Sequence, residues 1–191
     1  MIKLKDILME RISDVVYHFT KTAAADNIIG TNRFRLQEIP SRNVDPGRKY
    51  DMGYYMSVAR TKIEGYTKNL YSGCYFARFE LDGTKLSNTY KGGAYNYFQS
   101  KQGDNEYEEY EDRIYSKDMY IPNALNYIKR LDVDVNRECT TFDTGKLIKT
   151  ATRAGVPTFI YPSREKWAQQ SAGIEVKDLD GYKLFMQSIV K

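Results

Sequence analysis

The sequence predicts an α+β fold in one domain that spans residues 1–191. Three observations lead to this prediction. The length lies in the usual range of a single domain with its own core. The 41% apolar and 14% aromatic fractions supply enough surface for a core without a disulfide or a metal ion. Strand-like and helix-like segments are mixed without regular strand–helix–strand alternation, which favours α+β over a doubly wound parallel sheet.

Composition excludes several classes of protein. The longest apolar runs, such as Val156 to Tyr161, are far shorter than the roughly 20 residues of a membrane helix. Residues 1–12 lack the continuous apolar stretch of a secretory signal, so we expect a cytoplasmic protein without a membrane partner. Cys74 and Cys139 give no zinc-binding spacing with the single histidine. The net charge of +4 favours a polyanionic partner only weakly.

The first third of the chain is expected to hold two helices, a strand and a loop. Apolar residues near helical spacing predict a helix that ends near Ser13. β-Branched and aromatic residues predict a buried strand at Val15 to Thr20. Thr22 is expected to cap a helix that stops at Gly30. The proline-broken, basic stretch from Arg33 to Lys49 is typical of a loop that serves solubility or phosphate binding.

The middle third is expected to begin with a strand, a helix and a strand, at Gly53 to Ser57, Arg60 to Leu70 and Gly73 to Leu81. Asp82-Gly83 is a turn signal, and Lys91-Gly92-Gly93 indicates the start of a loop-rich region. A further strand is expected at Tyr107 to Tyr115, where tyrosines alternate with acidic residues. In the last third we expect two helices, a strand and a helix capped by Ser163, the first three at Asn123 to Lys129, Asp143 to Arg153 and Thr158 to Tyr161.

His18 is the only histidine, and it lies in the apolar and aromatic strand Val16-Tyr17-His18-Phe19-Thr20. Alone it is explained by a buried imidazole with one hydrogen-bond partner. A second segment, Gly53 to Tyr66, has a glycine that opens a strand, Tyr55 two residues later, a hydroxyl-containing turn and a second tyrosine. Together these segments resemble the His-Tyr-Glu branch of the ADP-ribosyltransferase superfamily. Val16 to Thr20 and Gly53 to Arg60 also resemble the DarT-type toxins that ADP-ribosylate DNA.

The resemblance implies a split β-sheet core with flanking helices and a site for NAD as a substrate. It implies that His18 binds a ribose hydroxyl, that Tyr66 stacks on nicotinamide and that Arg60 faces the dinucleotide or the reacting group. Other residues assigned to NAD binding by the same resemblance are Phe19, Thr20, Tyr55 and Thr61. Two departures are visible: Phe19 stands where the polymerase branch has glycine, and Ile63 replaces the second hydroxyl residue of the turn, which leaves Thr61.

The acidic run before Ile114 lies where the family has its catalytic glutamate, and we choose Glu111 for that role. A solvated acidic face is the alternative explanation of this run. Cleavage of the nicotinamide–ribose bond builds positive charge on the anomeric carbon, which a carboxylate stabilises. Glu109 completes a Glu-x-Glu pattern that resembles arginine-specific transferases, where the first glutamate acts on the acceptor.

The sequence leaves the acceptor open. The acidic end of the loop before Tyr110 favours a protein arginine, whereas the basic stretch from Arg33 to Lys49 and the 17 tyrosines favour nucleic acid. Two other functions use the same residues: an NAD glycohydrolase, with water as acceptor, and a non-enzymatic module that binds nucleic acid or protein. A metal-dependent nuclease is disfavoured by the poor set of ligands. The resemblance also implies a toxin or bacteriophage setting with an antitoxin or inhibitor protein as partner.

Overall fold

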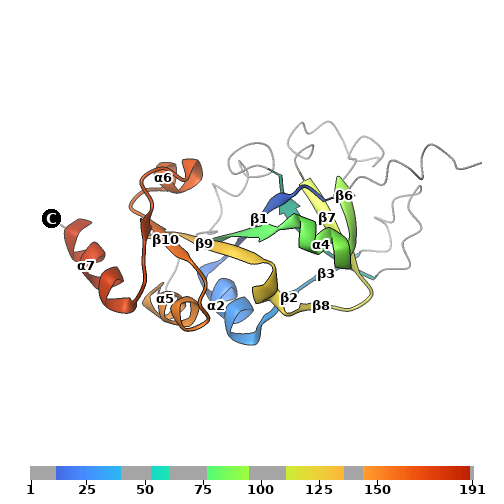
Figure 1. Cartoon of the computed structure of the whole chain (residues 1–191), viewed down its shortest axis with the longest axis horizontal. Coiled ribbons are helices and arrows are strands. Elements are labelled where there is room, and N and C mark those ends of the chain that lie inside the picture. Colours follow the sequence, from blue (N-terminus) through green and yellow to red (C-terminus); the bar gives the residue numbers. More distant parts are fainter. Residues whose placement is uncertain (1–11, 40–52, 61–76, 95–110, 136–143, 190–191) are drawn as a thin grey trace, which may run out of the picture.

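The computed structural model describes residues 12–39, 53–60, 77–94, 111–135 and 144–189. Within these ranges nine strands form one sheet with helices around it (Figure 1), and two further strands form a separate pair. The strand order is β11-β10-β9-β5-β1-β4-β7-β6, with β3 beside β4. The pairing of β9 with β10 is parallel, and the other pairings between described strands are antiparallel. The predicted combination of helices with a large sheet is confirmed.

The bounds of the elements are as follows. The strands of the large sheet are β1 (Val15–Thr20), β3 (Gln37–Glu38), β4 (Tyr54–Ala59), β5 (Ala77–Asp82), β6 (Lys91–Ala94), β7 (Glu111–Ser116), β9 (Ile128–Asp134), β10 (Thr158–Tyr161) and β11 (Ile174–Glu175). The separate pair is β2 (Arg33–Arg35) and β8 (Tyr120–Pro122). The helices are α2 (Thr22–Thr31), α4 (Gly83–Thr89), η4 (Ala124–Asn126), α5 (Thr144–Arg153), α6 (Arg164–Gln169) and α7 (Leu179–Ile189).

Two groups of strands meet at a narrow joint between β1 and β4. β1 pairs with β5 along its whole length, and β4 pairs with β7 along its whole length. In contrast, β1 and β4 share a single register pair, Tyr17 with Ala59. The sheet therefore consists of a β11-β10-β9-β5-β1 group and a β3-β4-β7-β6 group that one pair of residues connects.

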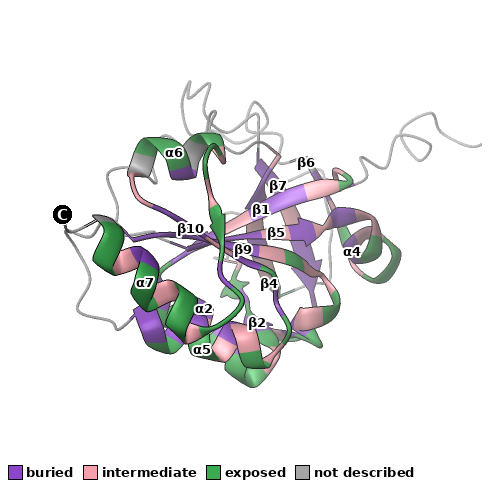
Figure 2. Cartoon of the chain, turned by 60° about the vertical axis from the view of Figure 1, so that its left-hand side comes forward, coloured by how far each residue is buried: buried purple, intermediate pink, exposed green. Residues whose placement is uncertain are grey.

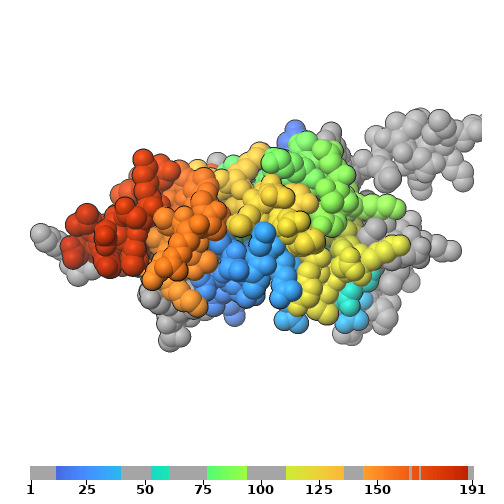
Figure 3. Space-filling model, turned by 60° about the horizontal axis from the view of Figure 1, so that its bottom comes forward, coloured from blue at the N-terminus to red at the C-terminus, as the bar shows by residue number. Residues whose placement is uncertain are grey.

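The main core lies between the sheet and the helices α2 and α5. Alternation along β1 turns Val16 into this core, where Phe79 of β5 and Leu131 of β9 are also fully buried. Ile28 of α2 and Leu147 of α5 close the core from the helical side. Figure 3 shows α2 (blue) beside α5 (orange) on this side of the molecule. Each buried aliphatic or aromatic side chain contributes about 1.5 to 3 kcal/mol to folding.

α6 covers the other face of the β1 end of the sheet. Tyr17, Phe19, Tyr161 and Trp167 form a second buried cluster there with Ala59. Ser163 caps α6 as predicted, because its hydroxyl accepts a hydrogen bond from the backbone N–H of Lys166. In Figure 2 the strands are largely buried, whereas α7 at the C-terminal end is mainly exposed.

Several predicted elements agree with the structure. The strands at Val15–Thr20 and Thr158–Tyr161 are β1 and β10. The expected helix before Gly155 is α5, and Gly155 adopts a φ of 70° just after it. The described part of the strand expected at Tyr107 to Tyr115 lies in β7, which runs from Glu111 to Ser116. The helices expected at the N-terminus and at Arg60 to Leu70 lie outside the described residues, except for residues 12 and 13 of the first and Arg60 of the second.

The end of the second predicted helix, from Thr22 to Gly30, was placed wrongly. α2 continues past Gly30, and Asn32 ends it in the left-handed conformation with φ 51°. Thr22 is the first helical residue, and the preceding Lys21 is the N-cap without a side-chain hydrogen bond. The stretch after it is not entirely loop, because β2 begins at Arg33 and turns Phe34 into the core. Asparagine tolerates the left-handed conformation, so it can replace glycine as a helix stop.

Two predictions near the sheet were also wrong. Asp82 does not form a turn with Gly83 but caps α4, by accepting a hydrogen bond from Lys85 N at 3.0 Å. The glycines after Lys91 form β6 and not a loop. A Cβ at Gly92 would lie only 2.6 Å from the carbonyl oxygen of Arg113 on β7, so a larger residue would not fit there. Glycine here permits the close approach of β6 to β7.

The helix expected at Asn123 to Lys129 is only the short 3-10 turn η4. Asn123 has a left-handed φ of 57°, and β9 begins at Ile128. Pairing of β9 with β5 and β10 outweighs the local helical pattern.

Candidate functional site

His18 bridges the joint between the two groups of strands. Its Nδ1 lies 3.3 Å from the carbonyl oxygen of Ser57 on β4. A carbonyl oxygen only accepts hydrogen bonds, so Nδ1 must carry the proton in this contact. In the described part of the chain, no register pair joins β1 to β4 beyond Tyr17 and Ala59. The imidazole therefore makes the connection where the ladder of backbone hydrogen bonds ends.

The surroundings of His18 favour a neutral ring. Burial lowers the pKa of His18 below 6.5, and the hydrogen bond to the Ser57 carbonyl acts in the opposite direction but is the smaller cause. The ring packs edge-on against Phe34, with 5.8 Å between the ring centroids. With the proton on Nδ1, the neutral ring offers Nε2 as a hydrogen-bond acceptor. The residue is half-buried, and within the described ranges Nε2 has no hydrogen-bond partner.

Glu111 begins β7 opposite Ala59, beside the joint. Glu111 is 4% exposed, yet only one of its two carboxylate oxygens accepts hydrogen bonds from described residues. Oε1 accepts two hydrogen bonds, from Ser57 Oγ at 2.5 Å and from Arg113 Nε at 3.0 Å. Within the described ranges, Oε2 has no hydrogen-bond partner. One carboxylate oxygen is thus fixed by the protein, and the other is left for a ligand.

Arg113 and Tyr55 continue this polar row on the same face. Side chains two residues apart on a strand share a face, so Arg113 lies beside Glu111. Ser57 is directly opposite Arg113 in the ladder of β4 and β7. The guanidinium carbon of Arg113 lies 4.6 Å from the ring centroid of Tyr55, which is a cation–π distance. Tyr55, assigned to NAD binding from the sequence, is therefore linked to Glu111 through Arg113.

Arg60 is bound on the opposite side of β7. Its Nε donates to Asp112 Oδ1 at 2.7 Å, and the other oxygen of Asp112 accepts from the backbone N–H of Ser13 at 2.9 Å. Asp112 follows Glu111 directly, so the two carboxylates point to opposite faces of the strand. About a third of the Arg60 side chain is exposed, at 32%. Any contact of Arg60 with a ligand would come from that exposed end.

Phe19 and Thr20 form part of the wall of the joint. Phe19 is 7% exposed and packs edge-on against Trp167 of α6, with 5.7 Å between ring centroids. Thr20 is also 7% exposed and pairs with Ala77 at the end of the β1–β5 ladder. Both residues are closely packed, so their backbone groups are better placed than their side chains to meet a ligand.

Three residues predicted for the site lie outside the described residues. They are Thr61, Tyr66 and Glu109. The roles given to them from the sequence stay predictions. Arg60 and Glu111 each stand at the edge of a described range, next to the segments that contain these three residues.

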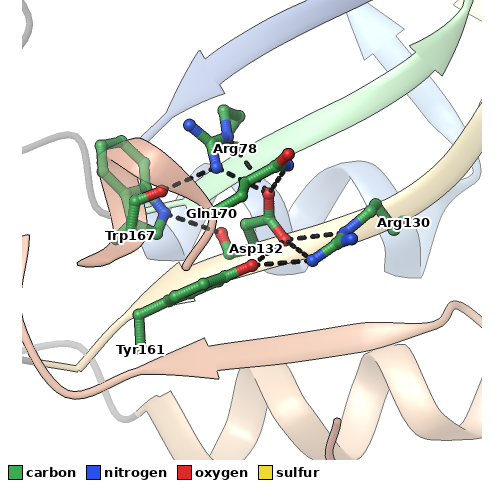
Figure 4. Close-up of polar contacts among 6 residues, drawn as sticks. All are labelled: Arg78, Arg130, Asp132, Tyr161, Trp167 and Gln170. Atoms are coloured by element: carbon green, nitrogen blue, oxygen red, sulfur yellow. Dashed lines mark hydrogen bonds and ion pairs between the residues drawn. The ribbon is translucent and has the colours of Figure 1, made fainter. Parts of the chain in front are cut away.

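A second polar cluster on the same face was not foreseen from the sequence (Figure 4). Asp132 of β9 is fully buried and accepts hydrogen bonds from Arg78, Arg130, Tyr161 and Gln170 at 2.5 to 3.2 Å. Burial, followed by the charge of Asp132, raises the pKa of Tyr161, so its hydroxyl stays protonated and donates. The cluster joins β5, β9 and β10 to the end of α6.

The buried Arg78 connects this cluster to the joint. Its guanidinium carbon lies 4.8 Å from the ring of Trp167 and 5.7 Å from that of Phe19. Its Nη2 also donates to the carbonyl oxygen of Trp167 at 2.8 Å. The network around Asp132 therefore holds α6 against Phe19. Phe19 is two residues from Tyr17, at which the two groups of strands meet.

A signal for this cluster exists in the sequence. Charged residues alternate with apolar ones at Arg78, Glu80 and Asp82 and again at Arg130, Asp132 and Asp134. The register places Arg78 opposite Asp132 and Glu80 opposite Arg130, so opposite charges meet across the strands. Ser57 and Arg113 carry no comparable local signal, because their contact with Glu111 depends on the pairing of β4 with β7.

Comparison of the chain with protein-family models, with curated proteins and with solved structures finds no match. No helix among the described residues is long and apolar enough to cross a membrane. The described residues also contain no group of three or more His, Cys, Asp or Glu side chains that could hold a metal ion.

Proposed function

We propose that the chain is a mono-ADP-ribosyltransferase of the His-Tyr-Glu type. It binds NAD at the joint between β1 and β4, cleaves the bond between nicotinamide and ribose, and transfers ADP-ribose to a macromolecule. The observation that carries this proposal is the meeting of His18 and Glu111 around one residue, Ser57. The backbone carbonyl of Ser57 accepts from the imidazole, and its hydroxyl donates to the carboxylate. Three segments that are distant in sequence thus contact each other through Ser57 at the joint.

The arrangement of strands supports an ADP-ribosyltransferase-like split sheet with flanking helices. The two groups of strands share only the pair Tyr17 and Ala59, and the residues proposed for chemistry lie next to that pair. Ligands bind where neighbouring elements separate, because backbone groups that would otherwise pair become available there. His18 stands on one side of this joint and Glu111 on the other.

The proposed chemistry depends on the free oxygen of Glu111. When the ribose C1′–N bond breaks, its electron pair leaves with nicotinamide and positive charge develops on the ribose ring. Oε2 of Glu111 accepts a hydrogen bond from the ribose 2′-hydroxyl and stabilises this cation. A nucleophilic atom of the acceptor then forms a bond to C1′ and loses its proton to water. A fixed carboxylate is effective because it needs no reorganisation as the charge forms.

The remaining residues bind and orient NAD. Nε2 of neutral His18 accepts a hydrogen bond from a ribose hydroxyl. Tyr66 stacks on nicotinamide, and the Thr61 hydroxyl holds the substrate near it. The backbones of Phe19 and Thr20 line the joint. Arg60, tied to Asp112, contributes the exposed end of its guanidinium to the dinucleotide.

Two acceptors are compatible with the chemistry, and they are distinguished by direct labelling. Glu109 would orient a protein arginine, whereas the basic residues from Arg33 onward would neutralise the phosphates of a nucleic acid. The purified protein is incubated with NAD labelled in its adenosine part and with cell protein, DNA or RNA. Label on protein identifies the first acceptor, and label on DNA or RNA the second. Label found only as free ADP-ribose indicates an NAD glycohydrolase.

The central test replaces Glu111 with glutamine, which keeps the size of the side chain and removes its charge. We expect release of nicotinamide to slow by about a hundredfold or more, the effect of losing one preorganised electrostatic partner. NAD should still raise the melting temperature, because ground-state binding involves other residues. Glu175→Gln, on the exposed strand β11, is the matched control and should leave the rate unchanged. A wild-type protein that neither binds NAD nor releases nicotinamide refutes the proposal.

A further inference from the structure

Arg113 is an arginine that the sequence did not single out, and it shares one oxygen of Glu111 with a hydroxyl. Arg113 Nε and Ser57 Oγ both donate to Oε1, at 3.0 and 2.5 Å. The arginine side chain is 16% exposed and the glutamate side chain 5% exposed, so this pair is mostly removed from water. Two donors on one oxygen restrict rotation of the carboxylate about its terminal bond.

Tyr55 supports Arg113 from the neighbouring strand. Tyr55 and Ser57 are two residues apart on β4 and so lie on one face, with Arg113 opposite Ser57. The Tyr55 ring lies 4.6 Å from the guanidinium carbon. A guanidinium that stacks on a ring and donates through Nε is held in one orientation. Tyr55 therefore supports Arg113, and Arg113 donates a hydrogen bond to Glu111.

We propose that Arg113 is a positioning residue, which holds Glu111 with Oε1 turned into the protein and Oε2 turned toward the substrate. This inference rests on the proposed function, because it assigns the free oxygen to the ribose 2′-hydroxyl. Arg113 itself needs no contact with NAD, and its effect passes through Glu111.

The experiment compares variants of the full chain in nicotinamide release and NAD binding. Arg113→Gln should lower kcat by about tenfold to a hundredfold, the range expected for loss of one charge-assisted hydrogen bond. The KM for NAD should change by less than about threefold, because the interaction acts in the transition state. Arg113→Lys keeps the charge without the planar stack and should give an intermediate kcat. Arg153→Gln is the control, since Arg153 is exposed at the end of α5 and has no part in the proposed site, and it should have no effect.

A double-variant comparison separates positioning from a general loss of structure. If Arg113 acts through Glu111, then Glu111→Gln with Arg113→Gln should be no slower than Glu111→Gln alone, within about twofold. A further loss in the double variant overturns the proposal, as does an unchanged kcat in Arg113→Gln. An analogue of NAD without the ribose 2′-hydroxyl gives a second measurement. The wild type should favour NAD over this analogue in rate, and Arg113→Gln should lose most of that preference.

Tyr55 supplies a variant for use if Arg113→Gln does not fold. Tyr55→Leu removes the stacking ring and leaves the ion pair, so it should lower kcat in the same way but less. Tyr55→Phe keeps the stacking ring, so its kcat should lie above that of Tyr55→Leu. Equal rates for Tyr55→Leu, Tyr55→Phe and the wild type overturn the supporting role. Absence of any nicotinamide release from the wild type refutes the proposed function, whereas normal release that is insensitive to Arg113 refutes only the positioning role.

Discussion

Replacing Asp132 with asparagine tests whether the buried network behind the joint holds the fold together. The change keeps the size of the side chain but removes its charge and replaces one accepting oxygen with an N–H₂ group that only donates. Asp132 Oδ2 accepts from Arg78 at 2.8 Å and from Gln170 at 2.5 Å, and Oδ1 accepts from Arg130 at 2.7 Å. An asparagine cannot satisfy both arginines, so one of them would face an N–H₂ group.

The expected cost follows from the burial of the ion pair. The side chains of Arg78 and Asp132 are both 0% exposed, so the arginine cannot turn to water when its carboxylate is lost. Breaking such a buried pair from one side costs about 3 to 5 kcal/mol of unfolding free energy. Typical domains have about 5 to 15 kcal/mol in total, so the variant should lose a large part of its stability. At roughly 2 to 4 °C per kcal/mol for a chain of this size, the melting temperature should fall by roughly 6 to 20 °C.

Unfolding in urea is followed by the fluorescence of Trp167, the single tryptophan of the chain, and by circular dichroism. Trp167 is 1% exposed and lies against the network, so it reports directly on this region. The control is Asp180→Asn, because Asp180 is 88% exposed and its pairing with Lys183 at 3.5 Å is weak. Its midpoint should equal that of the wild type. A loss below about 1 kcal/mol in Asp132→Asn would show that the buried pair contributes little and that the argument from burial is wrong.

Three further predictions concern the joint and its surroundings. Because burial lowers the pKa of His18 below 6.5, the unfolded chain binds a proton at this residue more readily than the folded chain. The contribution of His18 to stability should be full above pH 6.5 and decrease as the pH falls below it, by at most about 1.4 kcal/mol per pH unit. Urea midpoints at pH 7.5 and 5.5 should show this slope in the wild type but not in His18→Gln. Phe19 lies at the joint and packs against Trp167, so NAD bound at the joint should change the fluorescence emission of Trp167. A titration without any change would place the ligand elsewhere. Gly83→Ala should destabilise the chain, since the new Cβ would lie 1.7 Å from the carbonyl oxygen of Ser13, whereas Gly53→Ala meets nothing within 4 Å and should not, as thermal melts of both variants would reveal.

Elements with strong local signals could be predicted from the sequence. The run of β-branched and aromatic residues at Val15–Thr20 forms β1, and the Ser163 hydroxyl caps α6 as expected. Such signals lie within a few residues of each other, so they do not depend on distant parts of the chain. The glycines of β6 misled the prediction for the opposite reason. Glycine usually indicates a loop, but Gly92 is required by the close approach of another strand.

The site shows the same division between local and distant information. His18 and Glu111 were chosen because of their residue types and order, and the structure brings both into contact with Ser57. Ser57 and Arg113 were missed, because nothing around them in the sequence distinguishes them from an ordinary serine and arginine. Their importance comes from the register of β4 with β7, which sets Ser57 opposite Arg113. A difference of one residue in that register would turn them to opposite faces of the sheet.

The dual role of Ser57 explains how a narrow joint can keep two strands in a fixed relation. Its carbonyl oxygen accepts a hydrogen bond from His18 of β1, and its hydroxyl donates one to Glu111 of β7. A movement of β4 away from β1 would therefore lengthen the His18 contact and shift Glu111 with the same strand. Since the ladder supplies only one register pair at this point, these side-chain contacts set the distance between imidazole and carboxylate. A ligand that bound both groups would hold the two halves of the sheet together, so binding and rigidity of the joint should increase in parallel.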